Sequence, residues 1–299
     1  MATPTQWDGQ SKGSVLGTRI FLKLISVVGL YPAYCLLAPV SLYYVFREKE
    51  SCRVIGYFRS RLGLPTNIFH LWRHFFSFGM SILDRYAFLS KSSSFFTMQI
   101  INEEAISQAL SAGKGVILVG AHIGNWEIAG NLLQDRIQVP INYTMVDAEK
   151  PEISKAFGKA FDRRRATIIP INQDSMGLML EILKALRGNE IVCMHGDRLF
   201  GGTGRTTQFL NRPVEFPIGP FAIAAATGAP VIPIFAVKKG LRIYEMKAFD
   251  PIEVTTTSER DKESCIGSAL EQFVGILEQV SREHPYEWFN FYDFWGEAK

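Results

Sequence analysis

Between residues 101 and 248, short apolar runs alternate with segments of helical periodicity, and this alternation constrains the fold more than any other feature. The apolar runs predict strands over 115–120, 141–145, 166–171, 190–194, 230–237 and 241–248. The segments around them predict helices over 102–112, 125–133, 152–165, 175–187 and 217–227, with a long closing helix over 260–281. This order predicts an α/β fold with a layered mixed or parallel sheet flanked by helices.

The first 95 residues differ from the rest because they are helical in pattern and rich in aromatic and basic side chains. We therefore expect a helical, membrane-associating region over 1–95 and an α/β domain over 96–299, which forms one continuous unit. An aromatic tail over 285–295 follows the closing helix.

Leu24–Phe46 contains no charged side chain over 23 residues. About 20 apolar residues suffice to cross a bilayer, but Pro32 and Pro39 break or kink a helix. Two short amphipathic pieces lying in the membrane interface are therefore the favoured interpretation. A membrane span and a pair of core helices stay open as alternatives. The aromatic segment Ile68–Phe78 fits a membrane-surface helix and a core helix equally well.

Composition excludes few classes of protein. A hydrophobic content of 47% with 22 phenylalanines supports a sizeable core, and a net charge of +3 does not resemble the dense basic surface of a nucleic-acid binder. The four cysteines show no CxxC pairing, so we expect reduced thiols and neither a disulfide framework nor a zinc ribbon. The polar N-terminus does not predict a cleavable signal peptide.

Gly115–Glu127, GVILVGAHIGNWE, combines a buried strand, a turn with His122 and the start of a helix at Asn125. His122 and Glu127 are five positions apart, so on one helix their side chains would point about 140° apart. They meet only if His122 lies in the turn and Glu127 in the first helical turn, where the helix N-terminus favours a carboxylate. Glu127 then holds the imidazole in one tautomer, as a general base requires. Because no serine or cysteine accompanies the pair, it would activate a substrate's own nucleophile.

A second group of polar residues, His195, Asp197 and Arg198, follows the strand predicted over 190–194. Open α/β sheets bind ligands beyond the carboxyl ends of their strands, so His122 and Asp197 are expected to share a crevice. His195 and Asp197 are possible metal ligands, but no third and fourth ligand has a suitable spacing, and no metal is expected. A turn with a structural Asp197–Arg198 ion pair stays open.

Arg163, Arg164 and Arg165 form a charge run, which is typical of a solvated face or of a site that binds a phosphate or an oxyanion. The glycine-dense segment Phe200–Arg205 lacks the lysine and the following helix of a P-loop, and we expect a flexible lid or a loop beside a long ligand. Cys193 lies among apolar neighbours and is expected in the core rather than as a nucleophile.

Three segments resemble the lysophospholipid acyltransferase superfamily: Ala121–Glu127 (AHIGNWE), Gly196–Arg198 (GDR) and Phe216–Val237 (FPIGPFAIAAATGAPVIPIFAV). The branch they resemble most comprises the lipid A biosynthesis (lauroyl/myristoyl) acyltransferases and their mannoside-acylating relatives. His122 and Glu127 meet the H-x4-D/E signature of that branch.

The resemblance implies transfer of a fatty acyl chain from an acyl-carrier protein or coenzyme A thioester to a hydroxyl or amine of a lipid or glycolipid. It places the enzyme at the cytoplasmic face of the cell inner membrane, with no bound cofactor and no acyl-enzyme. It makes His122 the base and Glu127 its orienting acid, and it assigns substrate binding to Arg163–Arg165, Asp197 and Arg198, with Asn125 in support. An acyl groove along Ile218–Ala226, beside Phe200 and Phe209, fits this chemistry.

Two other functions stay open. A lipid or thioester hydrolase would use the same His122–Glu127 pair to activate water, and a membrane-bound scaffold would need no catalysis. The acceptor, the acyl chain length, the choice of carrier protein or coenzyme A, O- or N-acylation and the oligomeric state do not follow from the sequence.

Overall fold

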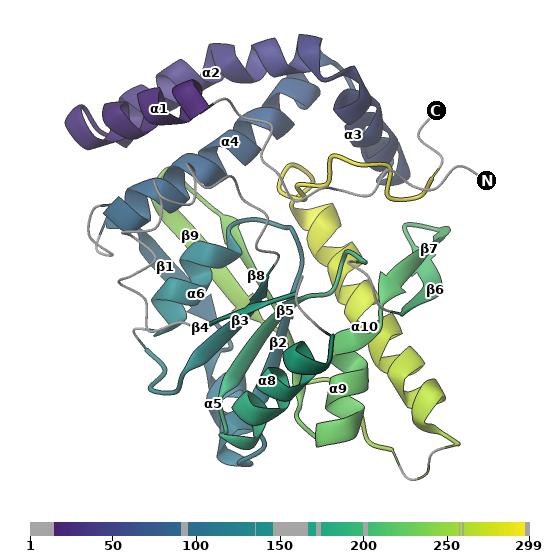
Figure 1. Ribbon diagram of the computed structural model, residues 1–299. Coiled ribbons are helices and arrows are strands. Elements are labelled where there is room, and N and C mark those ends of the chain that lie inside the picture. Colours follow the sequence, from purple (N-terminus) through teal and green to yellow (C-terminus); the bar gives the residue numbers. More distant parts are fainter. Residues whose placement is uncertain are drawn as a thin grey trace. The chain divides into compact units, whose positions relative to one another are not determined.

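The computed structural model describes residues 15–90, 95–134, 136–145, 167–171, 175–199, 203–256, 258 and 260–296 (Figure 1). Among these, the residues before Thr97 and those after Glu283 form one compact unit, and the residues between them form a second. The predicted α/β fold is confirmed: a mixed, mostly parallel sheet is flanked by helices, and helices also make up the N-terminal part. The helix predicted over 152–165 lies outside the described residues.

The first unit contains the N-terminal helices α1 (Val15–Val27), α2 (Leu30–Arg47), α3 (Lys49–Arg61) and α4 (Ile68–Ser90). In the uncharged segment Leu24–Phe46, the helix breaks at Gly29 and not at the prolines, where the sequence predicts the break. Gly29 has a φ of 112°, a backbone conformation that glycine adopts readily. Pro32 lies in the first turn of α2, where proline is tolerated, and Pro39 lies inside the helix. No helix in the described part of the chain has the length and apolar character needed to span a bilayer.

The aromatic tail packs within this first unit. Trp288 is almost fully buried and meets Phe58 of α3 edge-on, with ring centroids 4.8 Å apart. Phe291 stacks on Phe75 of α4 at 5.5 Å. Aromatic side chains of Ile68–Phe78 therefore pack in part against the tail, as expected for a core helix, which is one of the two interpretations of that segment.

The second unit is built on a seven-stranded sheet of order β1-β9-β8-β2-β5-β3-β4. All neighbours are parallel except the antiparallel pair β8 and β9. The strands are β1 (Thr97–Ile101), β2 (Val116–Gly120), β3 (Ile141–Met145), β4 (Thr167–Pro170), β5 (Ile191–His195), β8 (Val231–Lys238) and β9 (Ile243–Ala248).

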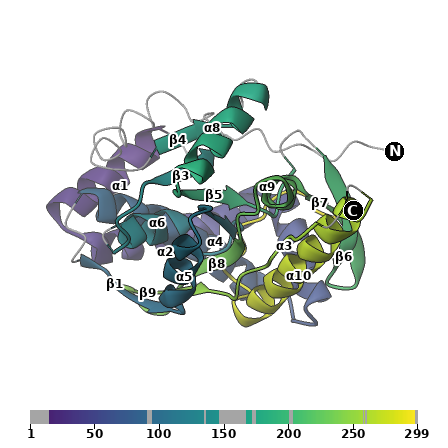
Figure 2. The same cartoon turned by 90° about the horizontal axis from the view of Figure 1, so that it is seen from below.

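Helices cover both faces of this sheet (Figures 1 and 2). They are α5 (Glu103–Ser111), α6 (Trp126–Gln134), α8 (Ser175–Arg187), α9 (Gly219–Thr227) and α10 (Lys262–Glu283). Ile106 of α5 and Leu133 of α6 share one buried cluster with alternate strand residues such as Leu118. On the opposite face, Phe273 of α10 contacts Phe221 of α9 and stacks on Phe235 of β8. Because both faces are covered, β2 is buried along its whole length, which explains its uninterrupted apolar sequence.

A two-stranded hairpin, β6 (Gly204–Phe209) and β7 (Arg212–Pro217), was not predicted. The expectation of a loop over 200–205 is therefore wrong for Gly204 and Arg205, which lie in β6. Phe200 to Gly202 lie outside the described residues. The expected helix over 217–227 begins later, at Gly219, because Pro217 ends β7.

Gly124 lies between the end of β2 and α6, where the chain runs alongside β8 and forms a parallel β-bridge with Ala236. Its φ is 68°, and a Cβ atom there would lie 1.8 Å from the carbonyl oxygen of Ala236. The next residue, Asn125, donates its backbone N–H to that same oxygen at 2.8 Å. Only glycine permits both the left-handed backbone and this close approach.

We expect Gly124→Ala to lower the free energy of unfolding by about 3 kcal/mol or more, because backbone strain adds to a collision with backbone atoms. Gly113→Ala is the matched control: its φ is 71°, but no atom lies within 4 Å of the added Cβ. That variant is expected to lose only about 1 kcal/mol, the strain alone. Urea denaturation of both variants measures the difference, and equal losses would contradict the close approach.

Candidate active site

The site lies where β2 and β5 end side by side. The two parallel strands are in register, with Gly120 of β2 opposite His195 of β5, and Gly196 donates its backbone N–H to Gly120 at 2.9 Å. His122 and Asp197 each lie two residues beyond these paired positions. The topology therefore brings them together at the carboxyl edge of the sheet, as the sequence predicts.

Asp197 binds His122 through both carboxylate oxygens. The backbone N–H of His122 donates to Oδ2 at 3.0 Å, and Nδ1 of its ring lies 2.8 Å from Oδ1. Asp197 is fully buried. Burial favours the neutral acid, but the interactions with His122 and the positive charge of Arg198 outweigh it and hold the pKa of Asp197 well below its ordinary value. The carboxylate is therefore ionised and only accepts hydrogen bonds.

The proton on the His122 ring is consequently fixed on Nδ1, which donates to Asp197, and Nε2 carries the lone pair. Burial and the charge of Arg198 lower the pKa of His122, more than Asp197 raises it, so the ring is neutral near pH 7. Its side chain is 23% exposed. A neutral, oriented and accessible imidazole can take a proton from a bound hydroxyl, amine or water.

His195 is the second imidazole of the site. Its ring meets the ring of His122 edge-on, with centroids 4.2 Å apart, and that of Trp126 at 5.0 Å. Burial and the neighbouring His122 lower the pKa of His195 to about 3, so it is neutral. Trp126 comes from the first turn of α6, which fixes His195 between two aromatic rings.

Asn125 and Glu127 belong to the start of α6. The Asn125 side-chain oxygen accepts a hydrogen bond from the backbone N–H of Ile128 at 3.4 Å, the geometry of a helix N-cap. Asn125 therefore supports the site by starting the helix. Glu127 is 6% exposed and lies in the first helical turn, as predicted. The orienting bond to Nδ1 of His122, which the sequence assigns to Glu127, is made by Asp197.

Of the four arginines expected to bind substrate, only Arg198 lies in the described part of the chain. Arg198 is half-buried beside Asp197, and its charge acts on Asp197 and on both imidazoles. Arg163, Arg164 and Arg165 lie outside the described residues. Cys193 packs against the core, and burial raises the pKa of its thiol to about 12, so it is no nucleophile near neutral pH.

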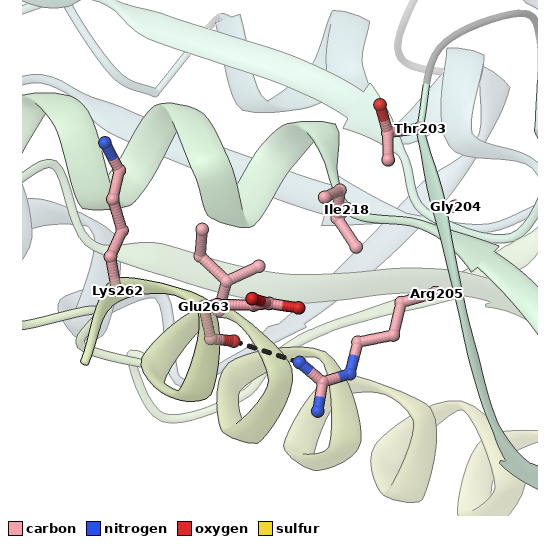
Figure 3. Close-up of a pocket in the computed structure, with 7 residues that line it drawn as sticks. Thr203, Gly204, Arg205, Ile218, Lys262 and Glu263 are labelled. Carbon is pink, nitrogen blue, oxygen red and sulfur yellow. Dashed lines mark hydrogen bonds between the residues drawn. The ribbon is translucent and has the colours of Figure 1, made fainter. Parts of the chain in front are cut away.

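A cavity of about 310 Å³ opens between β6 and the first turns of α9 and α10 (Figure 3). Its lining combines Arg205, Lys262 and Glu263 with apolar groups, and Arg205 donates to the backbone oxygen of Glu263 at 2.9 Å. Ile218, which the sequence places in an acyl groove, does line this cavity. Phe209, Phe221, Ile223 and Ala224 do not line this cavity and are buried in the core.

Residues 73–296 match the family model described as bacterial lipid A biosynthesis acyltransferase. The match covers more than half of the chain, and the chain belongs to this family, as the resemblance of its motifs predicts.

Curated relatives are phosphatidylinositol mannoside acyltransferases. Those of two Mycobacterium tuberculosis strains (CDC 1551 / Oshkosh and H37Rv) are 25% identical over 186 residues, which is 61% of this chain and 55% of the relative. That of Mycolicibacterium smegmatis is 25% identical over 156 residues, 49% of each chain. The chain thus spans about half the length of the curated relatives it matches.

Proposed function

We propose that this protein transfers a fatty acyl group from an acyl-carrier protein or coenzyme A thioester to a hydroxyl or amine of a lipid or glycolipid. One observation carries the proposal: in a member of an acyltransferase family, a buried carboxylate fixes the tautomer of an accessible, neutral histidine at the ligand-binding edge of the sheet. The names of the relatives support a glycolipid acceptor.

In the proposed step, Nε2 of His122 takes the proton of the acceptor hydroxyl or amine while its oxygen or nitrogen attacks the thioester carbonyl carbon. The new ester or amide bond forms as the carbon–sulfur bond breaks, and the imidazolium returns its proton to the departing thiolate. Asp197 stabilises the imidazolium between these events because its carboxylate stays ionised. Glu127 adds a second carboxylate at the start of α6, and Arg198, with one or more of Arg163–Arg165, binds polar groups of the substrates.

The experiment is a thioester assay with purified protein. Acyl-carrier-protein and coenzyme A thioesters carrying a labelled acyl chain are incubated with and without phosphatidylinositol mannosides or lipid A precursors. Transfer of label to the acceptor lipid supports the proposal. Release of free fatty acid at the same rate without any acceptor would instead identify a hydrolase. If no thioester is turned over, the non-catalytic scaffold is the function that the result favours.

We also propose that the N-terminal helices dock on the cytoplasmic face of the inner membrane, where such acceptors reside. In α1, α2 and the turn between them, large apolar side chains point to solvent, among them Leu16, Val27, Val28 and Phe46, which are 60% to 73% exposed. Exposed basic residues such as Lys23 lie among them. Apolar side chains that reach into the acyl boundary, with cations at the headgroups, are typical of a helix lying in the interface.

Docking predicts that Leu16→Glu/Val28→Glu lowers binding to vesicles of anionic phospholipid by about 10-fold or more, since each site loses the burial of an apolar side chain. Leu241→Glu is the matched control, because Leu241 is 56% exposed but belongs to the second unit. Vesicle co-sedimentation measures the partition. Equal binding of both variants would contradict docking through α1 and α2.

A further inference from the structure

His195 has no part in the proposed transfer, yet it completes a set of metal-ligand side chains. One donor atom from each of His122, His195 and Asp197 can be chosen so that all lie within 4.8 Å of one another. The sequence showed His195 and Asp197 but no third ligand, because His122 is distant in the chain and joins them only through the register of β2 and β5.

We propose that His122, His195 and Asp197 bind a zinc ion that reversibly inhibits the enzyme. Two imidazoles and one carboxylate are the donor set that zinc takes where it keeps an open coordination position. The inhibition, though not the binding, rests on the proposed function.

The donor atoms of the three side chains suit this ion, because zinc takes imidazole nitrogen and carboxylate oxygen as ligands. Histidine nitrogen also selects zinc over magnesium, which prefers oxygen ligands. Arg198 acts against binding because its positive charge reaches all three groups.

The geometry requires a small adjustment. Tetrahedral zinc with bonds of about 2.0–2.2 Å holds its donor atoms about 3.3 Å apart. Nδ1 of His122 and Oδ1 of Asp197 are closer, at 2.8 Å, and the widest separation in the cluster is larger, at up to 4.8 Å. Zinc binding therefore requires side-chain rotations that shorten the widest separation and move Nδ1 of His122 away from Oδ1 of Asp197. The partly exposed side chain of His122 gives the ion a path of entry.

Bound zinc would abolish base catalysis whichever ring nitrogen of His122 it takes. If zinc occupies Nε2, the lone pair that accepts the proton is used. If zinc occupies Nδ1, the neutral ring carries its proton on Nε2, and that nitrogen donates instead of accepting. The same three side chains therefore cannot hold zinc and activate an acceptor at one time.

The test is calorimetric titration of ZnCl2 into the substrate-free protein, in a Cys35→Ser background because Cys35 is an exposed thiol. We expect one zinc ion per chain, no matching heat with MgCl2, and a loss of about 100-fold or more in affinity for His195→Gln, since even outer-shell changes cost about 10–100-fold. His122→Gln provides a second variant if His195→Gln does not fold. His70→Gln, in the first unit, is the control and should bind zinc like the parent.

Absence of saturable zinc binding, or unchanged affinity in folded His195→Gln and His122→Gln, would overturn the zinc site. In the active protein, zinc should inhibit acyl transfer and a chelator should restore it. Zinc binding through these residues in a protein that transfers no acyl group would support the metal site and contradict the proposed function alone.

Discussion

Replacement of His122 by alanine is expected to lower the turnover of acyl transfer by about 10²–10⁴-fold, the range for loss of a general base. The loss should appear in kcat with little change in KM, because the imidazole acts on the proton that moves in the transition state. The variant should still fold. Asp197 keeps its bond from the backbone N–H of residue 122 and loses only the bond to the ring.

Steady-state rates with saturating thioester and acceptor measure this effect, and circular dichroism confirms the fold. His70→Ala removes a histidine from the first unit and controls for nonspecific effects of the substitution. A turnover within a factor of two of the unmodified protein would remove His122 from the mechanism. Loss of folded protein would instead make the residue structural.

Much of the second unit could be predicted because local patterns and tertiary packing agree there. The helix over Ser175–Arg187 has the predicted bounds, since Gly188 ends an amphipathic segment. β2 was recognisable because a strand covered on both faces is apolar throughout. β1 was missed because Thr97–Ile101 is an edge strand in which exposed and half-buried side chains alternate, so no fully buried apolar run marks it.

The β6–β7 hairpin could not be predicted because its turn uses an unusual residue. Leu210 and Asn211 form the two-residue connection with φ of 52° and 61°. Glycine or asparagine normally occupies such positions. Leu210 is fully buried, and its backbone N–H donates to the Glu278 carboxylate of α10 at 2.8 Å. Tertiary contacts therefore stabilise a turn that the local sequence does not indicate.

The sequence predicted that His122 and Asp197 lie close together at neighbouring strand ends, but it did not predict the bond between them. His122 and Glu127 are close in sequence after β2, so the local spacing favours an interaction between these two side chains. The bond from His122 to Asp197 depends on β5 lying next to β2 with Gly120 opposite His195, and strand order and register are not contained in the local pattern. Sequence reasoning could place both residues at strand ends, and only the topology selects the carboxylate that holds the ring.

Asp197→Asn is expected to lower turnover by about 10³–10⁴-fold, comparable to the loss that the same change causes in a Ser-His-Asp triad. The backbone N–H of His122 needs an acceptor, so the amide oxygen of the asparagine must stay where Oδ2 now lies. The NH2 group then faces Nδ1 of the ring, in place of Oδ1. Nδ1 must accept, the ring proton moves to Nε2, and the base is lost although the side chains keep their positions.

Nitrogen-15 NMR of the histidine rings provides the decisive readout, because it distinguishes a proton on Nδ1 from one on Nε2. If Asp197 had only a structural role, its replacement would not change which nitrogen carries the proton. Glu127→Gln is the matched control: it also replaces a buried carboxylate by its amide. We expect it to reduce activity with binding retained, less than Asp197→Asn does, and to leave the His122 tautomer unchanged. The carboxylate that orients His122 is the one whose replacement by an amide moves the ring proton from Nδ1 to Nε2. A larger loss of activity in Glu127→Gln, with a tautomer change in that variant and none in Asp197→Asn, would therefore assign the orienting role to Glu127.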